Sequence, residues 1–138
     1  MRTKTVKRYY CDHCGKSGGS SFHIKRHEIG CTKNPNRVCG MCRSSGNSQR
    51  PLQDLVSACE RDIADFKRRY PEFPFDYEAI SPDELIAEAN HCPACVLAGL
   101  RLCKNDMAVV LTFDFKSECA RFWQKQNADR EHMELHHG

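Results

Sequence analysis

The cysteines constrain the fold of this chain more than any other feature of its sequence. Ten occur among 138 residues, and six of them form three Cys-x-x-Cys pairs. A pair with this spacing turns both sulfur atoms toward one point, as a tetrahedral zinc site requires. Leu, Ile, Val and Phe are too few for a large continuous core, so we expect metal binding to supplement apolar burial. The three pairs are Cys11 with Cys14, Cys39 with Cys42, and Cys92 with Cys95.

Residues 9–31 supply two further ligands for the first pair. Twelve residues separate Cys14 from His27, and Cys31 follows His27 by four positions. Residues at this spacing lie about 5–6 Å apart on one face of a helix, so an imidazole and a thiolate can point the same way. The two thiolates of the turn and the two ligands of the helix would then close a tetrahedron around Zn(II).

This spacing of four ligands resembles that of the nucleic-acid-binding zinc fingers of the two-cysteine, two-histidine family, in the variant whose last histidine is a cysteine. Tyr9 stands two residues before the first cysteine, where that family has an aromatic residue. Gly15 and Lys16 follow the second cysteine as they often do in the family, and Ile24 occupies the position of the family's leucine. The resemblance covers residues 9–31 only, and it implies a ββα-like finger.

The sequence departs from that family at one core position. The family's aromatic residue four positions after the second cysteine would fall at Gly18, and Gly19 follows it. Either Phe22 fills the place of the missing aromatic residue, or the β-hairpin is shorter and looser than in the family.

The resemblance also implies a helix whose first turns read base edges, and either Ser20 or Ser21 can cap that helix. With His27 as the seventh helix residue, Arg26 would bond a guanine edge and His23 a neighbouring purine. A finger that only folds, or one that binds protein, fits the same residues. The positions that face the major groove in the family fall at Ser20, Phe22, His23 and Arg26, with Lys25 and Lys16 suited to phosphates.

Charge is distributed unevenly along the chain. Residues 1–50 carry eleven Lys and Arg against Asp12 and Glu28, a net charge of +9, whereas residues 51–138 carry ten against sixteen, a net charge of −6. The total is only +3. A basic front and an acidic remainder are typical of a nucleic-acid-binding arm joined to a body with another role, although a merely solvated charge run gives the same count. Residues 1–8 form the most basic stretch, with Arg2, Lys4, Lys7 and Arg8 available for phosphates.

The second and third cysteine pairs predict a four-cysteine zinc site. Between Cys42 and Cys92 lie 49 residues, and closing a loop of that length is tolerable because its entropic cost grows only with the logarithm of length. Structural zinc sites often join two such pairs. The site would use Cys39, Cys42, Cys92 and Cys95, which gives two Zn(II) per chain with the first site.

Other ligand sets remain open. His23 and His27 are also four residues apart, so they could complete the first site and free Cys31 for the second. His91 lies beside Cys92 and could replace a cysteine there. We prefer the set with twelve residues between Cys14 and His27.

The body between the two halves of the second site reads as helical. Apolar residues recur at spacings of three and four through residues 52–70, which predicts an amphipathic helix closed by Pro71, with Asp62 on its solvated face. Residues 71–80, with two prolines and three aromatics, predict an ordered but irregular link packed on that helix. Residues 81–84 form a capping box that opens a short helix ending near residue 90.

Residues 96–104 predict a helix that starts at the third cysteine pair. Residues 107–115 are rich in β-branched and aromatic side chains and predict a buried strand, and helical spacing returns over 116–134. We expect the three cysteines outside the two sites to be buried apolar residues. These three are Cys59, Cys103 and Cys119.

The predicted fold is a small zinc-stabilised α+β fold, mostly helical. An N-terminal ββα-like finger precedes a helical body that the four-cysteine zinc site clamps. The domain boundaries that we predict are a flexible basic arm at 1–8, the finger at 9–31, a linker at 32–38, the four-cysteine module with its helical insert at 39–104, and a strand with a C-terminal helix packed on the body at 105–138.

The function that this sequence favours is a small zinc-binding regulatory or accessory protein that contacts DNA or RNA, most simply duplex DNA. A zinc-stabilised adaptor or inhibitor that binds protein through the acidic body, of the kind encoded by viruses of bacteria, is the alternative. One finger reads about three base pairs, so a homodimer or a protein partner would supply further specificity. We expect no catalytic residues, because the βαβ surroundings of a redox Cys-x-x-Cys are missing.

The N-terminal residues lack the apolar core of a signal peptide, and no apolar run approaches membrane-spanning length, so we expect no membrane association. Cys-x-x-Cys pairs without an export signal favour metal over disulfides. We therefore expect an intracellular, reducing compartment, cytoplasmic or nucleoid-associated.

Overall fold

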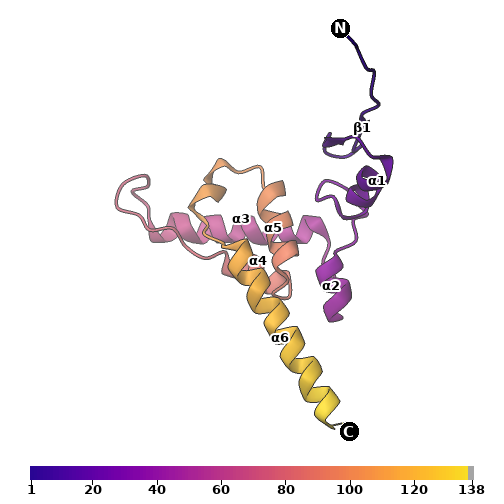
Figure 1. Ribbon diagram of the computed structural model, residues 1–138. Coiled ribbons are helices and arrows are strands. Elements are labelled where there is room, and N and C mark those ends of the chain that lie inside the picture. Colours follow the sequence, from indigo (N-terminus) through magenta and orange to yellow (C-terminus); the bar gives the residue numbers. More distant parts are fainter. Residues whose placement is uncertain (137–138) are drawn as a thin grey trace. The chain divides into compact units, whose positions relative to one another are not determined.

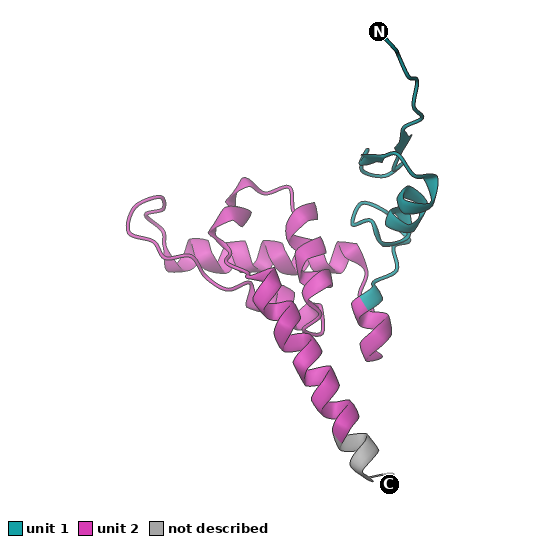
Figure 2. Cartoon of the chain, in the orientation of Figure 1, with its two compact units in different colours: residues 1–40 teal, residues 41–138 magenta. Residues whose placement is uncertain are grey.

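The computed structural model describes residues 1–136, with side chains through residue 131, as a mostly helical protein with a two-stranded sheet (Figure 1). Its chain divides into two compact units, residues 1–40 and residues 41–138 (Figure 2). Residues 1–8 lie outside any helix or strand. None of the described helices is both long and apolar enough to span a membrane.

The first unit begins with a short antiparallel hairpin. Strand β1 (Tyr9–Tyr10) pairs with β2 (Ser17–Gly18), with Tyr9 opposite Gly18. Gly15 has a φ of 77°, a left-handed conformation that favours glycine, and its N–H donates to the Cys11 carbonyl at 2.9 Å. The glycine therefore allows the tight turn that carries the first cysteine pair.

Helix α1 (Ser21–Gly30) follows the hairpin, and Ser20 caps it as predicted, because its side-chain oxygen accepts a bond from the His23 N–H. Ile24 is the buried residue of this fully described helix. It packs with Cys11, Cys31 and Tyr9 in a cluster that contains a single aliphatic side chain. So small a core cannot by itself offset the entropy that the unit loses on folding.

Phe22 and Gly18 show how the hairpin packs without the aromatic residue that the finger family has at position 18. Phe22 is 67% exposed, so it does not take the place of the missing aromatic residue. A Cβ atom on Gly18 would lie 3.3 Å from Cδ1 of Ile24, so the Ile24 side chain packs closely against the hairpin backbone at Gly18. Of the two alternatives, the short hairpin is the one observed.

The second unit begins with helix α2 (Gly40–Ser45), whose first residue belongs to the N-terminal unit, and is built around helix α3 (Leu52–Arg69). Helices α4 (Asp83–Glu88) and α5 (Pro93–Leu102) pack on α3. The predicted spacing is confirmed, since Leu55, Cys59, Ile63 and Phe66 are fully buried in α3. Gly99 of α5 is required by this packing, because a Cβ atom there would lie 2.7 Å from Cδ1 of Leu85.

Residues 71–80 form the expected irregular link on α3. The ring of Phe66 lies 5.1 Å from that of Tyr70, 5.5 Å from that of Phe73 and 5.8 Å from that of Tyr77, measured between centroids. Phe73 and Tyr77 are themselves 4.9 Å apart. These edge-on and tilted contacts are the favourable geometry for aromatic pairs, so they fix the link against the end of the helix.

Asp62 corrects two predictions. It is 3% exposed rather than solvated, and its carboxylate accepts bonds from the N–H groups of Glu84 at 2.9 Å and Leu85 at 3.0 Å. The predicted capping box is wrong, because Pro82 is the N-cap of α4 without a side-chain bond and Asp62 of α3 supplies the cap instead. Desolvation raises the pKa of the Asp62 carboxyl, while its two N–H donors act in the opposite direction.

The predicted strand at 107–115 is also wrong. Residues Asp106–Val110 form a 3₁₀ helix, η1, which starts where the Asn105 side chain accepts a bond from the Met107 N–H at 3.0 Å. Local turn chemistry has overridden the β propensity of the valines, and Val109 is 83% exposed. Extended pairing is limited here to one parallel bridge between Leu111 and Ile80.

Helix α6 (Phe115–His136) starts close to the predicted position and packs against α5. Cys119, Phe122 and Gln126 are half-buried on one face, whereas Trp123 is 42% exposed and does not join them. Of the cysteines expected to be buried, Cys59 is, but Cys103 and Cys119 are only partly so. No side chain of α6 is fully buried within its described part, residues 115–131.

Replacing Asp62 with Ala should lower the free energy of unfolding by about 1–3 kcal/mol, because the two N–H groups at the start of α4 lose their acceptor in a largely buried place. Urea denaturation of the metal-loaded chain, followed by circular dichroism, measures this loss. Asp65→Ala is the matched control, since the Asp65 carboxylate pairs with Arg69 at the surface, where ion pairs contribute about 0–1 kcal/mol. Equal losses in the two variants would contradict the capping role of Asp62.

Candidate metal centres

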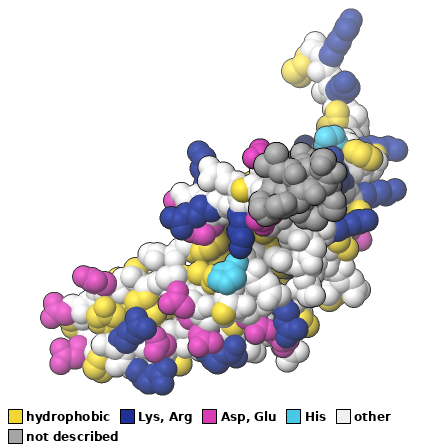
Figure 3. Space-filling model, turned by 90° about the horizontal axis from the view of Figure 1, so that it is seen from below, with side chains coloured by type: hydrophobic (Ala, Val, Ile, Leu, Met, Phe, Trp, Pro, Cys, Tyr) yellow, Lys and Arg dark blue, Asp and Glu magenta, His cyan; other side chains and the backbone are white. Residues whose placement is uncertain are grey.

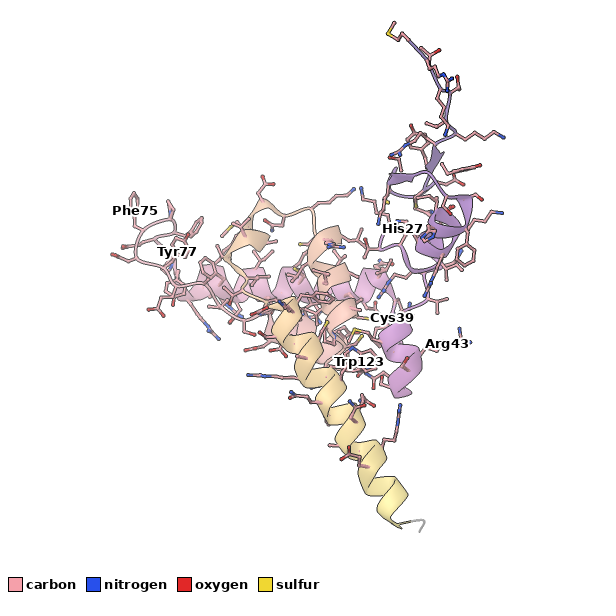
Figure 4. All side chains as sticks on the ribbon, viewed as in Figure 1. His27, Cys39, Arg43, Phe75, Tyr77 and Trp123 are labelled. Atoms are coloured by element: carbon pink, nitrogen blue, oxygen red, sulfur yellow. The ribbon has the colours of Figure 1, made fainter. Side chains whose placement is uncertain are left out.

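The first candidate metal centre lies within the N-terminal unit and joins the hairpin to α1. The ligand atoms of its four residues all lie within 4.8 Å of one another. Sγ of Cys14 is 3.2 Å from Nε2 of His27, which projects from α1 (Figure 4). Cys31 reaches the group because it is the C-cap residue of that helix. The group consists of Cys11, Cys14, His27 and Cys31.

The hairpin turn prepares its thiols for metal binding. The Lys16 backbone N–H and the His27 ring lower the pKa of Cys14 to about 6, well below the ordinary thiol value. The N–H of His13 points at Sγ of Cys11 from 3.4 Å. Burial instead raises the pKa of the Cys31 thiol. Because thiolates are the metal ligands, an ion would have to displace the proton of the buried Cys31.

The alternative ligand set with His23 does not form. His23 is exposed and lies outside the group, where its ring meets that of Phe22 edge-on at a centroid distance of 5.7 Å. Cys31 lies in the first group and not with the other cysteine pairs. The spacing of twelve residues between Cys14 and His27 is therefore the one that the folded chain uses.

The second candidate metal centre is made of cysteines alone. Its four sulfur atoms lie within 4.8 Å of one another, all four residues are buried, and Sγ of Cys42 is 3.5 Å from Sγ of Cys95. Helix α5 begins between two of the ligands, since Cys92 is its N-cap. His91 is exposed and does not belong to the group. The members are Cys39, Cys42, Cys92 and Cys95.

Both groups fit a tetrahedral ion with sulfur-preferring chemistry. In a tetrahedron, Zn–S bonds of about 2.3 Å place two sulfur atoms about 3.8 Å apart, and the shorter Zn–N bond places a nitrogen and a sulfur atom about 3.6 Å apart. The observed distances are 3.5 Å between Sγ of Cys42 and Sγ of Cys95, and 3.2 Å between Sγ of Cys14 and Nε2 of His27. Four buried cysteines gathered within a few ångströms are the donor set of a structural zinc site. The two groups are thus able to hold metal ions, and their composition is compatible with two zinc ions.

The remaining cysteines lie outside both groups. Burial, together with the neighbouring Cys103 thiol, raises the pKa of Cys59 to about 12, so this thiol stays protonated. Burial also raises the pKa of Cys119. A protonated thiol is a poor ligand and a poor nucleophile, so the buried Cys59 acts as a small packing residue.

The residues predicted to touch nucleic acid lie on the surface of the first unit. Lys7, Arg8, Lys16, His23, Lys25 and Arg26 are exposed, and Ser20 is half-buried. Two of them already have partners. The Ser20 oxygen caps α1, and the Arg8 guanidinium donates to the Ser17 hydroxyl at 3.0 Å. Sequence reasoning left the place of Phe22 open, because no local pattern distinguishes a core aromatic from an exposed one at the start of a short helix.

Comparison with protein-family models, with curated proteins and with solved structures gives no match for this chain. The assignment of the two candidate metal centres therefore rests on the positions of the ligand atoms in this chain alone. Their eight residues come from three Cys-x-x-Cys pairs and one helix end.

We expect native mass spectrometry of the reduced chain to count two zinc ions. Cys14→Ser and Cys95→Ser should each reduce the count to one, because each removes a ligand from a different group. Cys119→Ser is the matched control and should keep both ions, since Cys119 lies outside the groups. A wild-type chain that holds one ion or none would contradict the two-site architecture.

Proposed function

We propose that this chain is a small zinc-binding regulatory or accessory protein whose N-terminal unit contacts nucleic acid, most simply duplex DNA. The observation that carries the proposal is the division of α1 into two faces. Ile24 and His27 turn toward the core and the first metal centre, while His23, Lys25 and Arg26 are exposed. A metal-fixed helix with a basic outer face is suited to a polyanionic groove.

The charge of the first unit supports the same partner. Residues 1–40 carry nine Lys and Arg against Asp12 and Glu28, a net charge of +7 before any metal is counted. No acidic residue lies in the first turn of α1, all of which is described. The positive end of the helix dipole adds to this field, so the first turn of α1 is the part of the unit most favourable to phosphate.

Each exposed side chain has a distinct role in such a contact. Arg26 can donate two parallel bonds to a guanine edge, and His23 can donate one to a neighbouring purine. Because the Ser20 oxygen accepts the capping bond, its hydroxyl hydrogen is the group left for a base or a phosphate. Lysines give affinity without sequence information. In this proposal the side chains that would meet phosphates are exposed ones, namely Lys7, Arg8, Lys16 and Lys25.

Zinc would have a structural role in this proposal. Both candidate centres supply four protein ligands, and a full set of four leaves no open position for a substrate or a reactive water. We therefore infer that neither ion would be catalytic, in line with the proposal of a protein that is not an enzyme. The ions would hold the hairpin against α1 and the start of α5 against α2.

A second candidate function, an adaptor that binds protein, is favoured by the tip of the 71–80 link. Phe75 is 73% exposed there (Figure 4). Phe73 and Tyr77 contact the buried Phe66 and hold the loop in shape, although Tyr77 is itself 44% exposed. Acidic side chains lie among hydrophobic ones at this end of the unit, with basic side chains close by (Figure 3). The fitting partner is a protein with an apolar pocket rimmed by basic residues. The acidic residues are Glu72, Asp76 and Glu78.

If the nucleic-acid proposal is right, mobility-shift titrations of the zinc-loaded chain on duplex DNA should give an affinity that falls steeply as salt rises. Arg26→Ala should weaken binding by about tenfold, because a bidentate guanine contact is worth about 1–3 kcal/mol. Arg101→Ala is the matched control, since Arg101 is an exposed arginine of α5 in the other unit. Binding that is insensitive to salt, or equally weakened in both variants, would refute the proposed DNA contact.

The adaptor function predicts a different pattern. Phe75→Ala should reduce the capture of a protein partner from a cell extract by at least tenfold, because burial of one aromatic ring often dominates an interface. Arg26→Ala should leave that capture unchanged. Affinity capture with quantitative mass spectrometry compares the two variants with wild type. A partner retained by Phe75→Ala would exclude this loop as its docking surface.

A further inference from the structure

Phe22 is one of several large apolar side chains of the first unit that stay exposed, and it is the aromatic one on α1. Its side chain is 67% exposed, and the core of the unit is complete without it. Its described ring contact is the edge-on meeting with His23, with an angle of 84° between the ring planes. An exposed aromatic ring is ordinary by itself, so its meaning depends on what surrounds it.

The surroundings of Phe22 are basic. Residues three, four and seven positions later share its side of the helix, and these are Lys25, Arg26 and Ile29. All three are exposed. Phe22 thus places a large apolar surface about one helical turn from a guanidinium and an ammonium group. A ligand for this face must offer an apolar group and strong hydrogen-bond acceptors within the same short distance.

The major groove of duplex DNA offers this combination. Guanine presents two acceptors to an arginine, and the 5-methyl group of thymine is the apolar group that projects into the groove. Uracil lacks that methyl group, and the major groove of double-stranded RNA is too deep and narrow for side chains to read. A basic face with an exposed phenyl ring therefore suits duplex DNA that contains thymine better than it suits double-stranded RNA.

We propose that Phe22 is a specificity-determining residue whose ring contacts the 5-methyl group of a thymine near the base read by Arg26. This inference rests on the proposed function. The edge-on contact with His23 limits the positions of the ring, so less rotational freedom is lost when the methyl group packs against it. The consequence is a preference for thymine at one position of the site and for duplex DNA over double-stranded RNA.

Substituting deoxyuridine for thymine tests the contact, since it removes the methyl group and keeps the Watson–Crick pairing. Duplex sites are first selected from a random library with the zinc-loaded wild-type chain, and each thymine is then replaced in turn. For wild type, one replacement should weaken binding by about fourfold, the value of one buried methyl group. For Phe22→Ala, the thymine and deoxyuridine duplexes should bind equally.

Two controls make the outcome specific. Ile29→Ala removes another exposed apolar residue of α1 and should keep the fourfold difference. Both variants should retain two zinc ions by native mass spectrometry, since neither side chain belongs to a metal group. These measurements separate loss of the methyl contact from loss of the folded unit.

The possible outcomes distinguish this inference from the function on which it rests. Salt-dependent DNA binding without any thymine-to-deoxyuridine effect, or with the same effect in Phe22→Ala, overturns the role of Phe22 alone. Equal affinity for a matched RNA duplex overturns it too. A wild-type chain without salt-dependent binding to any nucleic acid removes both proposals, and Phe22 would then belong to a protein-binding face.

Discussion

The convergence of four ligand atoms on one point is the constraint on which the first unit depends. Its apolar cluster contains Ile24 as the single aliphatic residue, with Tyr9 packed at the edge and two cysteines as the other members. Structural zinc contributes about 10–16 kcal/mol in isolated fingers, far more than such a cluster could. The hairpin, the capped helix and the exposed basic face all follow from that closure, because each needs the turn and the helix end to meet.

The second unit combines candidate metal ligands with ordinary packing. Helix α3 presents a continuous apolar stripe, and α4 and α5 cover it closely enough that Gly99 leaves no room for a side chain. A buried carboxylate is the exception in this interior. Asp62 is tolerated because two N–H groups at the start of α4 satisfy it, so a polar bond orients the helix that leads to Cys92 and the second metal group. Packing and ligation therefore act on the same segment.

Spacing within a short stretch of sequence predicted much of this molecule. The ligands of the first group, the Ser20 cap and the apolar stripe of α3 are set by positions three, four or twelve residues apart, where helix and turn geometry decide the outcome. Asp62 could not be predicted in this way, because its partners lie 22 and 23 residues away and its charge favours the surface in any local reading. The prediction of a strand near residues 106–110 was wrong for the opposite reason, because here a local turn decided the structure. Two valines suggested a strand, but Asn105 begins a 3₁₀ turn and no neighbouring strand was available to pair.

The two metal groups differ in how far water can reach them. All four cysteines of the second group are buried, whereas Cys14 of the first is exposed. Ligand exchange at a thiolate site starts at the sulfur that solvent and incoming thiols can reach. Competing chelators or oxidants would therefore remove an ion from the first group, by attack at Cys14, faster than they would remove one from the second group. Loss of an ion would then begin in the first unit, while an ion bound by the four buried cysteines would be retained longer.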